Sequence, residues 1–279
     1  ASIIIWTTTP WTMPGNRAVA YGNDISYQVV EGVDPSEGSL CEKGDVLVIA
    51  GDLVGDVIEA IGGGETALRT NLMGYEMAGT VTAHPMAGHG YDYDVPLLAG
   101  NHVTTEQGTG FVHIAPGHGV EDFELAHLEH GIAVPDTVSE NGQIMEHLPV
   151  FGGMHVLRDN AKIADLIASH KGVIGIGKLV HSYPHSWRSK APVIYRNTAQ
   201  WFVSMESHGL RDTALNELAK TTFYPVAGQK RLTSMIDQRP DWCLSRQRAW
   251  GVPLTIFVNK ETGEPLRDPA VHARVVDAI

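Results

Sequence analysis

Four threonines stand beside two tryptophans near the start of the chain, in the run WTTTPWT at residues 6–12. Successive side chains of a strand point to opposite faces, so we expect Thr7 and Thr9 on one face, about 7 Å apart, and Thr8 on the other. Two hydroxyl groups at this spacing can hold a polar ligand or a water molecule. A threonine-rich strand without a ligand explains the same pattern, because threonine favours strands. From the pattern alone this structural interpretation is the favoured one.

A second cluster lies in the run GTGFVHIAPGHGVED at 108–122, which predicts a strand, a proline–glycine turn and the start of a helix. His113 stands on the strand, and Asp122 stands in the first helical turn. The start of a helix stabilises negative charge, so we expect Asp122 to stay ionised and to be able to bind a cationic group such as an α-ammonium. The structural alternatives are that Asp122 only stabilises the helix dipole and that His113 is a core histidine whose hydrogen bonds are made within the protein.

Histidines in the first half raise a metal-dependent hydrolase as a further hypothesis. They are His84, His89, His113, His118, His127 and His130. No HExxH or HxH motif occurs, and the two cysteines, Cys41 and Cys243, are too far apart in sequence for a CxxC site. The GxSxG, GxGxxG and GxxxxGK[ST] patterns are absent as well. We therefore expect neither a metal site nor a self-contained nucleotide-binding fold.

Charge is distributed unevenly along the chain. The net charge of −12 combines −18 over residues 1–150 with +6 over residues 151–279. The acidic part repels phosphate, whereas the second part carries arginine and lysine among aromatic residues, in HSYPHSWRSK at 181–190 and DWCLSRQRAWGVP at 241–253. Arg188 and Lys190 are candidates for phosphate contact, and a solvated basic loop is an equally good interpretation.

The surrounding pattern predicts a mixed α/β fold with a β-barrel-like core and peripheral helices. We expect no membrane span, because no 18-residue apolar run occurs, and we interpret the chain as an excised fragment from a reducing cytosol. Expected strands are 3–6, 25–30, 45–50, 76–83, 96–99 and 110–115. Expected helices are 52–61, 120–130, 159–171 and 210–220.

Five runs taken together resemble the isoleucyl-tRNA synthetase family, in that family's order. They are WTTTPWTMPGNRA at 6–18, GTGFVHIAPGHGVED at 108–122, HSYPHSWR at 181–188, QWFVSM at 200–205 and DWCLSRQRAWGVP at 241–253. The resemblance implies an editing domain of a bacterial-type enzyme at 1–197, and the end of the insertion with a return segment toward the catalytic domain at 198–279. The HIGH and KMSKS signatures are absent, so ATP and Mg²⁺ belong to a synthetic site outside this chain, and no cofactor is expected here. Some family members bind zinc through CxxC where this chain has SWRS at 186–189, so we expect no zinc.

The resemblance also implies roles for the first two clusters. The expected reaction is hydrolysis of Val-tRNA(Ile), and of valyl-adenylate as a second substrate, with isoleucine excluded by size. Asp122 would bind the α-ammonium, His113 would form the size-selective wall, with a general-base role as a weaker alternative, and Thr7–Thr9 would position the acyl group and the attacking water. Further contacts to the pocket or the adenosine are expected from Trp11, Thr12 and Asn16. Expected partners are the tRNA(Ile) 3′ end carrying valine, valyl-adenylate and the rest of the synthetase chain, with no membrane, for a cytoplasmic monomer. The alternative function is an RNA-binding module without hydrolytic activity.

Overall fold

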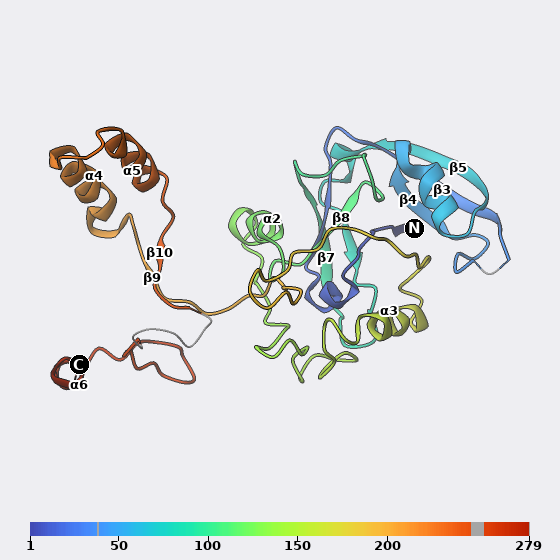
Figure 1. Cartoon of the computed structure of the whole chain (residues 1–279). Coiled ribbons are helices and arrows are strands. Elements are labelled where there is room, and N and C mark those ends of the chain that lie inside the picture. Colours follow the sequence, from blue (N-terminus) through green and yellow to red (C-terminus); the bar gives the residue numbers. More distant parts are fainter. Residues whose placement is uncertain (38, 247–253, 279) are drawn as a thin grey trace. The chain divides into compact units, whose positions relative to one another are not determined.

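The computed structural model describes residues 1–37, 39–246 and 254–278, and its chain divides into two compact units, 1–197 and 198–279 (Figure 1). Two four-stranded sheets build the first unit, with strand orders β1-β4-β3-β5 and β6-β7-β2-β8. The strands are β1 (Ser2–Ile3), β2 (Ala18–Tyr21), β3 (Ser26–Pro35), β4 (Val46–Ala50), β5 (Gly64–Met73), β6 (Val81–Ala83), β7 (Asp94–Ala99) and β8 (Phe111–Ile114).

Short helical segments connect and cover these sheets. They are the 3-10 helices η1 (Pro10–Gly15), η2 (Gly51–Leu53) and η3 (Gly74–Met77), the α-helices α1 (Val54–Ala60), α2 (Val120–Phe123) and α3 (Asn160–Ser169), and the π-helical turn η4 (Glu124–Glu129). The mixed α/β fold class predicted from the sequence is therefore confirmed.

The second sheet is organised around β2, whose four residues are all buried. β2 pairs in parallel with β7 and antiparallel with β8, and Val19 lies opposite His113 in that register. Alternation along β2 sends Val19 and Tyr21 into a core shared with β3 and β4, whereas Ala18 and Ala20 pack toward η4. The strand that carries His113 is thus fixed by a neighbour buried on both faces.

A glycine allows the two sheets to approach each other closely. Gly110 has φ +81°, and a Cβ at this position would lie 2.2 Å from the Cβ of Ala50. The backbone N–H of Ala50 donates to the carbonyl of Thr109 at 2.9 Å, and the Tyr27 hydroxyl donates to the carbonyl of Gly110 at 2.7 Å. Only glycine combines a positive φ with the absence of a Cβ, so Gly110 lets the start of β8 pack directly against the first sheet.

The second unit contains β9 (Phe202–Val203), η5 (Ser207–Gly209), α4 (Leu210–Lys220), α5 (Ala227–Asp237), β10 (Trp242–Cys243) and α6 (Pro269–Ala278). Among its described residues, Met205 is the one buried hydrophobic side chain. The three hydrophobic clusters of the described chain draw all their members from residues before 198. No described helix is both long enough and apolar enough to cross a membrane.

Most predicted elements are present, with several differences. The expected strand at 3–6 is reduced to β1, and the strand expected at 76–83 is wrong over its first half, because η3 occupies that part before β6 begins. The strands β2, β5 and β9 were not predicted, nor were α5 and α6. The run at 241–253 contains β10, and residues 247–253 lie outside the described chain.

Candidate functional site

The threonine run forms a turn rather than the predicted strand. The Thr7 hydroxyl oxygen accepts the backbone N–H of Thr9 at 3.0 Å and lies 3.3 Å from the Thr9 hydroxyl, so the expected spacing of about 7 Å is wrong. Thr8 is half-buried between them. The physical reason is that threonine bonds its own backbone two residues on, while Pro10 begins η1 without an N–H to offer a sheet. The two hydroxyls are closer together than a strand would place them.

His113 is joined to the segment after the threonines by a continuous set of hydrogen bonds. Thr12 Oγ1 donates to the carbonyl of Thr9 at 2.9 Å and lies 3.0 Å from His113 Nε2, so Nε2–H is the donor to that hydroxyl. Asn16 Nδ2 lies 3.0 Å from the carbonyl of Ala18, which can only accept, and 2.6 Å from His113 Nδ1. His113 is therefore the neutral Nε2–H tautomer, with both ring nitrogens engaged.

This arrangement disfavours His113 as a general base. Its ring is buried, and burial, followed by the neighbouring His84 and His118, lowers the pKa of His113 to about 3. The nitrogen lone pair that would accept a proton already accepts the amide N–H of Asn16. What remains is a rigid ring with a fixed orientation, which suits a wall of a pocket better than proton transfer.

Asp122 lies in α2, directly after the turn that follows β8. Its Oδ2 accepts the backbone N–H of Ala115 at 2.7 Å. Burial raises the pKa of the Asp122 carboxyl, although the Ala115 N–H and His102 act in the opposite direction. Desolvation therefore outweighs the helix start in its effect on this pKa, and ionisation of Asp122 stays a prediction. Within the described chain, none of the ion pairs involves this half-buried carboxylate.

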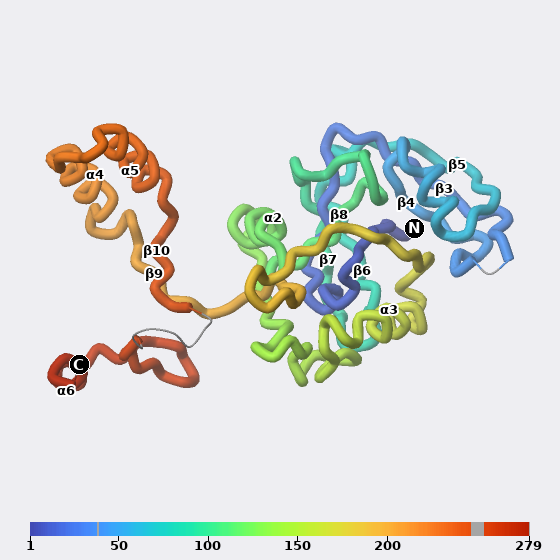
Figure 2. Tube along the Cα trace, viewed as in Figure 1, coloured from blue at the N-terminus to red at the C-terminus, as the bar shows by residue number. Residues whose placement is uncertain are grey.

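The two clusters lie side by side in the first unit. Besides the bonds to His113, the backbone N–H of Arg17 donates to the carbonyl of Ile114 at 2.9 Å. Trp11 is buried, and its ring meets the ring of His118 edge-on with centroids 5.0 Å apart. Figure 2 shows the blue N-terminal segment running past β6 toward β7 and β8. The structure thus brings Trp11, Thr12 and Asn16 to the end of the strand that carries His113.

The histidines considered as metal ligands have separate partners. His84 lies 2.9 Å from the Met13 carbonyl, His118 lies 2.9 Å from the Tyr195 carbonyl, and His127 lies 2.9 Å from the Ile132 carbonyl. His89 faces His170 edge-on, with ring centroids 4.1 Å apart. Over residues 1–37, 39–246 and 254–278, no three His, Cys, Asp or Glu side chains gather as a metal site would require.

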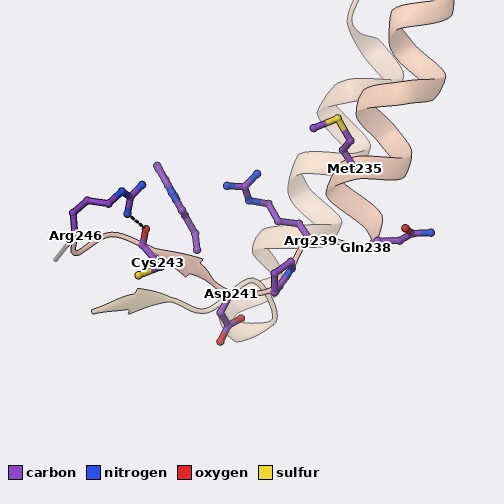
Figure 3. Close-up of a pocket in the computed structure, with 8 residues that line it drawn as sticks. Met235, Gln238, Arg239, Asp241, Cys243 and Arg246 are labelled. Carbon is purple, nitrogen blue, oxygen red and sulfur yellow. Dashed lines mark hydrogen bonds between the residues drawn. The ribbon is translucent and has the colours of Figure 1, made fainter. Parts of the chain in front are cut away.

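Most described residues of the basic run at 181–190 are exposed, and the described part of the second run, 241–246, is exposed or half-buried. In the first of them, the Arg188 guanidinium lies 4.9 Å from the centre of the Trp187 ring, and Trp187 is 75% exposed. In the second unit, an open groove of about 530 Å³ lies beside β10, and Figure 3 shows Arg239 and Arg246 extending on one side of it. Arg246 donates to the carbonyls of Cys243 and Ser245, at 2.6 and 2.9 Å. The sequence placed Arg246 in a basic aromatic run at 241–253, whereas neither Arg239 nor a groove was predicted.

Acid is expected to destabilise the first unit through its buried histidines. Burial lowers the pKa of His84 to about 4 and of His113 to about 3, below the 6.5 of an unfolded histidine. The unfolded chain therefore takes up protons first as the pH falls below 6.5, and each histidine removes about 2 kcal/mol of stability between pH 7 and pH 5. Asp122 acts with the opposite sign, because its raised pKa lets the folded state bind a proton first. Urea unfolding at both pH values checks this, and His84→Gln is expected to remove the contribution of His84, about 2 kcal/mol. Equal stability at both pH values would contradict it.

The comparisons with known proteins identify the class of the chain. Residues 9–277 match the family described as tRNA synthetases class I (I, L, M and V), and the chain belongs to that family. Its similar relatives are isoleucine–tRNA ligases, from Gluconobacter oxydans (47% identical over 99% of this chain), Pelagibacter ubique (47% over 98%) and Caulobacter vibrioides (44% over 100%). The chain spans about 30% of the length of these relatives. Among solved structures, GlLeuRS-CP1 is similar with a TM-score of 0.49 at 12% identity, over 63% of this chain and 84% of that one.

Proposed function

We propose that the first unit is an editing domain that hydrolyses valine esterified to tRNA(Ile), and valyl-adenylate, while excluding isoleucine. The observation that carries the proposal is the hydrogen bond of 3.0 Å between Thr12 Oγ1 and His113 Nε2, which joins two clusters 101 residues apart in sequence. Membership of the family and the similarity to isoleucine–tRNA ligases support it. The rest of a synthetase chain would hold the tRNA, and the hydrolysis would take place in the cytoplasm.

In the proposed reaction, a water oxygen adds to the ester carbonyl carbon and the bond from that carbon to the ribose oxygen breaks. The ribose oxygen takes up a proton and leaves as a hydroxyl, which is a better leaving group than an amide nitrogen. The hydroxyls of Thr7 and Thr9, 3.3 Å apart, form a pair that can hold the attacking water. Asp122, which takes part in none of the ion pairs of the described chain, would bind the α-ammonium. Because both nitrogens of His113 are engaged, proton transfer would depend on the neighbouring ribose hydroxyl rather than on a histidine base.

The test is deacylation by the chain of Val-tRNA(Ile) and Ile-tRNA(Ile), each with and without EDTA. We expect slow hydrolysis of the valyl ester, no hydrolysis of the isoleucyl ester and no effect of EDTA. Binding of a non-hydrolysable valyl-adenosine analogue is measured in parallel, because this small ligand does not depend on contacts to the body of the tRNA. RNA binding without hydrolysis and without binding of the analogue would support the RNA-binding alternative. Loss of activity in EDTA would support a metal-dependent hydrolase.

A further inference from the structure

The short helix η1 is held by three histidines that come from three segments of the chain. His84 follows β6, His113 lies in β8, and His118 lies in the turn between β8 and α2. They contact three successive residues of η1: His118 meets the Trp11 ring, His113 binds the Thr12 hydroxyl and His84 binds the Met13 carbonyl. Only His113 belongs to the site predicted from the sequence. His84 and His118 also contact η1, although they were not among the predicted site residues.

His84 has a single orientation and a single tautomer. Its Nε2 lies 2.9 Å from the carbonyl of Met13, which can only accept, so Nε2–H donates. Its Nδ1 accepts the backbone N–H of Met86 at 3.0 Å, and its ring stacks on Tyr91 with centroids 4.8 Å apart. The side chain is 2% exposed. The Met13 carbonyl therefore accepts a hydrogen bond from a ring whose orientation is fixed.

His118 is fixed equally firmly on the side of Trp11. Its Nδ1 lies 2.9 Å from the carbonyl of Tyr195, so Nδ1–H donates, and its Nε2 lies 2.6 Å from the buried hydroxyl of Thr137, which donates to the neutral ring. Gly15, the last residue of η1, lies next to the same ring, because a Cβ added at Gly15 would lie 3.3 Å from His118 Cδ2. His118 thus supports both ends of η1.

A helix of this kind needs external support. A six-residue 3-10 helix has poor hydrogen-bond geometry, and η1 contains two prolines, Pro10 and Pro14, that donate no backbone N–H. The threonine turn leads directly into it, so a shift of η1 moves the hydroxyls of Thr7 and Thr9 together with Thr12. Displacements of about 1 Å at a reacting centre cost up to a hundredfold in rate.

We propose that His84 and His118, the latter held by Thr137, are positioning residues that fix η1, and with it the threonine turn, against His113 for ester hydrolysis. The inference rests on the proposed function, since the rate it concerns is that of the editing reaction. Neither side chain needs to touch the substrate. Their effect passes through Trp11 and the Met13 carbonyl.

Kinetic variants test the proposal. His118→Ala, Thr137→Val and Gly15→Ala are expected to lower kcat for Val-tRNA(Ile) roughly 10- to 100-fold, with KM changed less than about threefold, because Asp122 still binds the ammonium. His84→Leu is expected to behave alike, and His84→Gln to recover most of the activity, because the Gln amide N–H can still donate to the Met13 carbonyl. Exposed His147 and Thr104 provide the matched controls, His147→Ala and Thr104→Val.

A spectroscopic measurement separates this inference from the proposed function. In ¹⁵N-histidine spectra of the whole chain at pH 7, we expect Nε2–H tautomers for His84 and His113 and an Nδ1–H tautomer for His118. Thr137→Val should shift the signals of His118 and of the Trp11 indole. Wild-type kcat in both His118→Ala and His84→Leu would overturn the inference and leave the proposed function standing. If the wild-type chain neither hydrolyses nor binds the valyl substrates, the proposed function fails, and an unmoved Trp11 signal in Thr137→Val would independently overturn the positioning of η1.

Discussion

Replacing Asp122 by asparagine is expected to lower kcat/KM for Val-tRNA(Ile) hydrolysis roughly 10- to 100-fold while leaving the fold intact. The amide oxygen of asparagine can still accept the N–H of Ala115, which Asp122 binds at 2.7 Å, so the turn after β8 keeps its support. What is lost is the negative charge. A hydrogen bond to a charged group contributes about 1.5–3 kcal/mol, and each 1.4 kcal/mol is tenfold in binding. Asp122→Ala removes the turn contact as well and should also lower the thermal midpoint.

The substrate supplies the control for this variant. In a tRNA ester of the α-hydroxy analogue of valine, a hydroxyl replaces the ammonium, so wild type and Asp122→Asn should hydrolyse it at similar, low rates. Glu121→Gln removes a neighbouring exposed charge and should retain full activity. If Asp122→Asn were equally impaired on both esters, its role would be structural. If it were unimpaired on the valyl ester, ammonium binding by Asp122 would be excluded.

The sequence was sufficient to predict the strand and helix that carry His113 and Asp122. The run at 108–122 contains an apolar segment, a proline–glycine turn and acidic residues at the expected start of a helix. Each of these is a local sequence signal, and the structure forms β8 and α2 at the corresponding positions. The partners of His113 were not predictable in this way. Thr12 and Asn16 are 101 and 97 residues away in sequence, and only the pairing of β2 with β8 brings them together.

Other differences arise from the competition between local and tertiary effects. β5 has a polar sequence without alternation, and most of its residues are exposed, so its extended form depends on pairing with β3 rather than on its own pattern. At Thr7–Thr9 the opposite occurs: strand propensity yields to a local hydrogen bond from the Thr9 N–H to the Thr7 hydroxyl. For Asp122, the helix start was visible in the sequence, but the burial that raises its pKa was not.

The largest change in specificity is expected from His113→Ala. The buried ring is held between Thr12 and Asn16, and removing it would leave space next to two polar groups that water can occupy. If the ring is the wall that excludes isoleucine, the variant should hydrolyse Ile-tRNA(Ile) and keep valine hydrolysis within about tenfold of wild type. A single methylene in an apolar pocket changes selectivity by only about 10- to 200-fold, a limit for which isoleucine and valine selection by the isoleucyl enzyme is itself the standard example. The gain in isoleucine hydrolysis should fall in that range.

A general-base role for His113 makes the opposite prediction, and one set of measurements separates the two. Loss of a base would abolish hydrolysis of the valyl ester without any gain on the isoleucyl ester, and would remove a titration from the pH–rate profile. Loss of a wall would instead raise isoleucine hydrolysis and retain valine hydrolysis. If the alanine variant proves too unstable to assay, His113→Gln serves as the second variant. The glutamine amide can still donate a hydrogen bond to Thr12. Continued full protection of Ile-tRNA(Ile) by both variants, with valine hydrolysis retained, would exclude the size-selective role. The hydrogen bonds of His113 favour the wall, because a ring whose two nitrogens are already paired inside the protein has no free site from which to accept the proton of a water molecule.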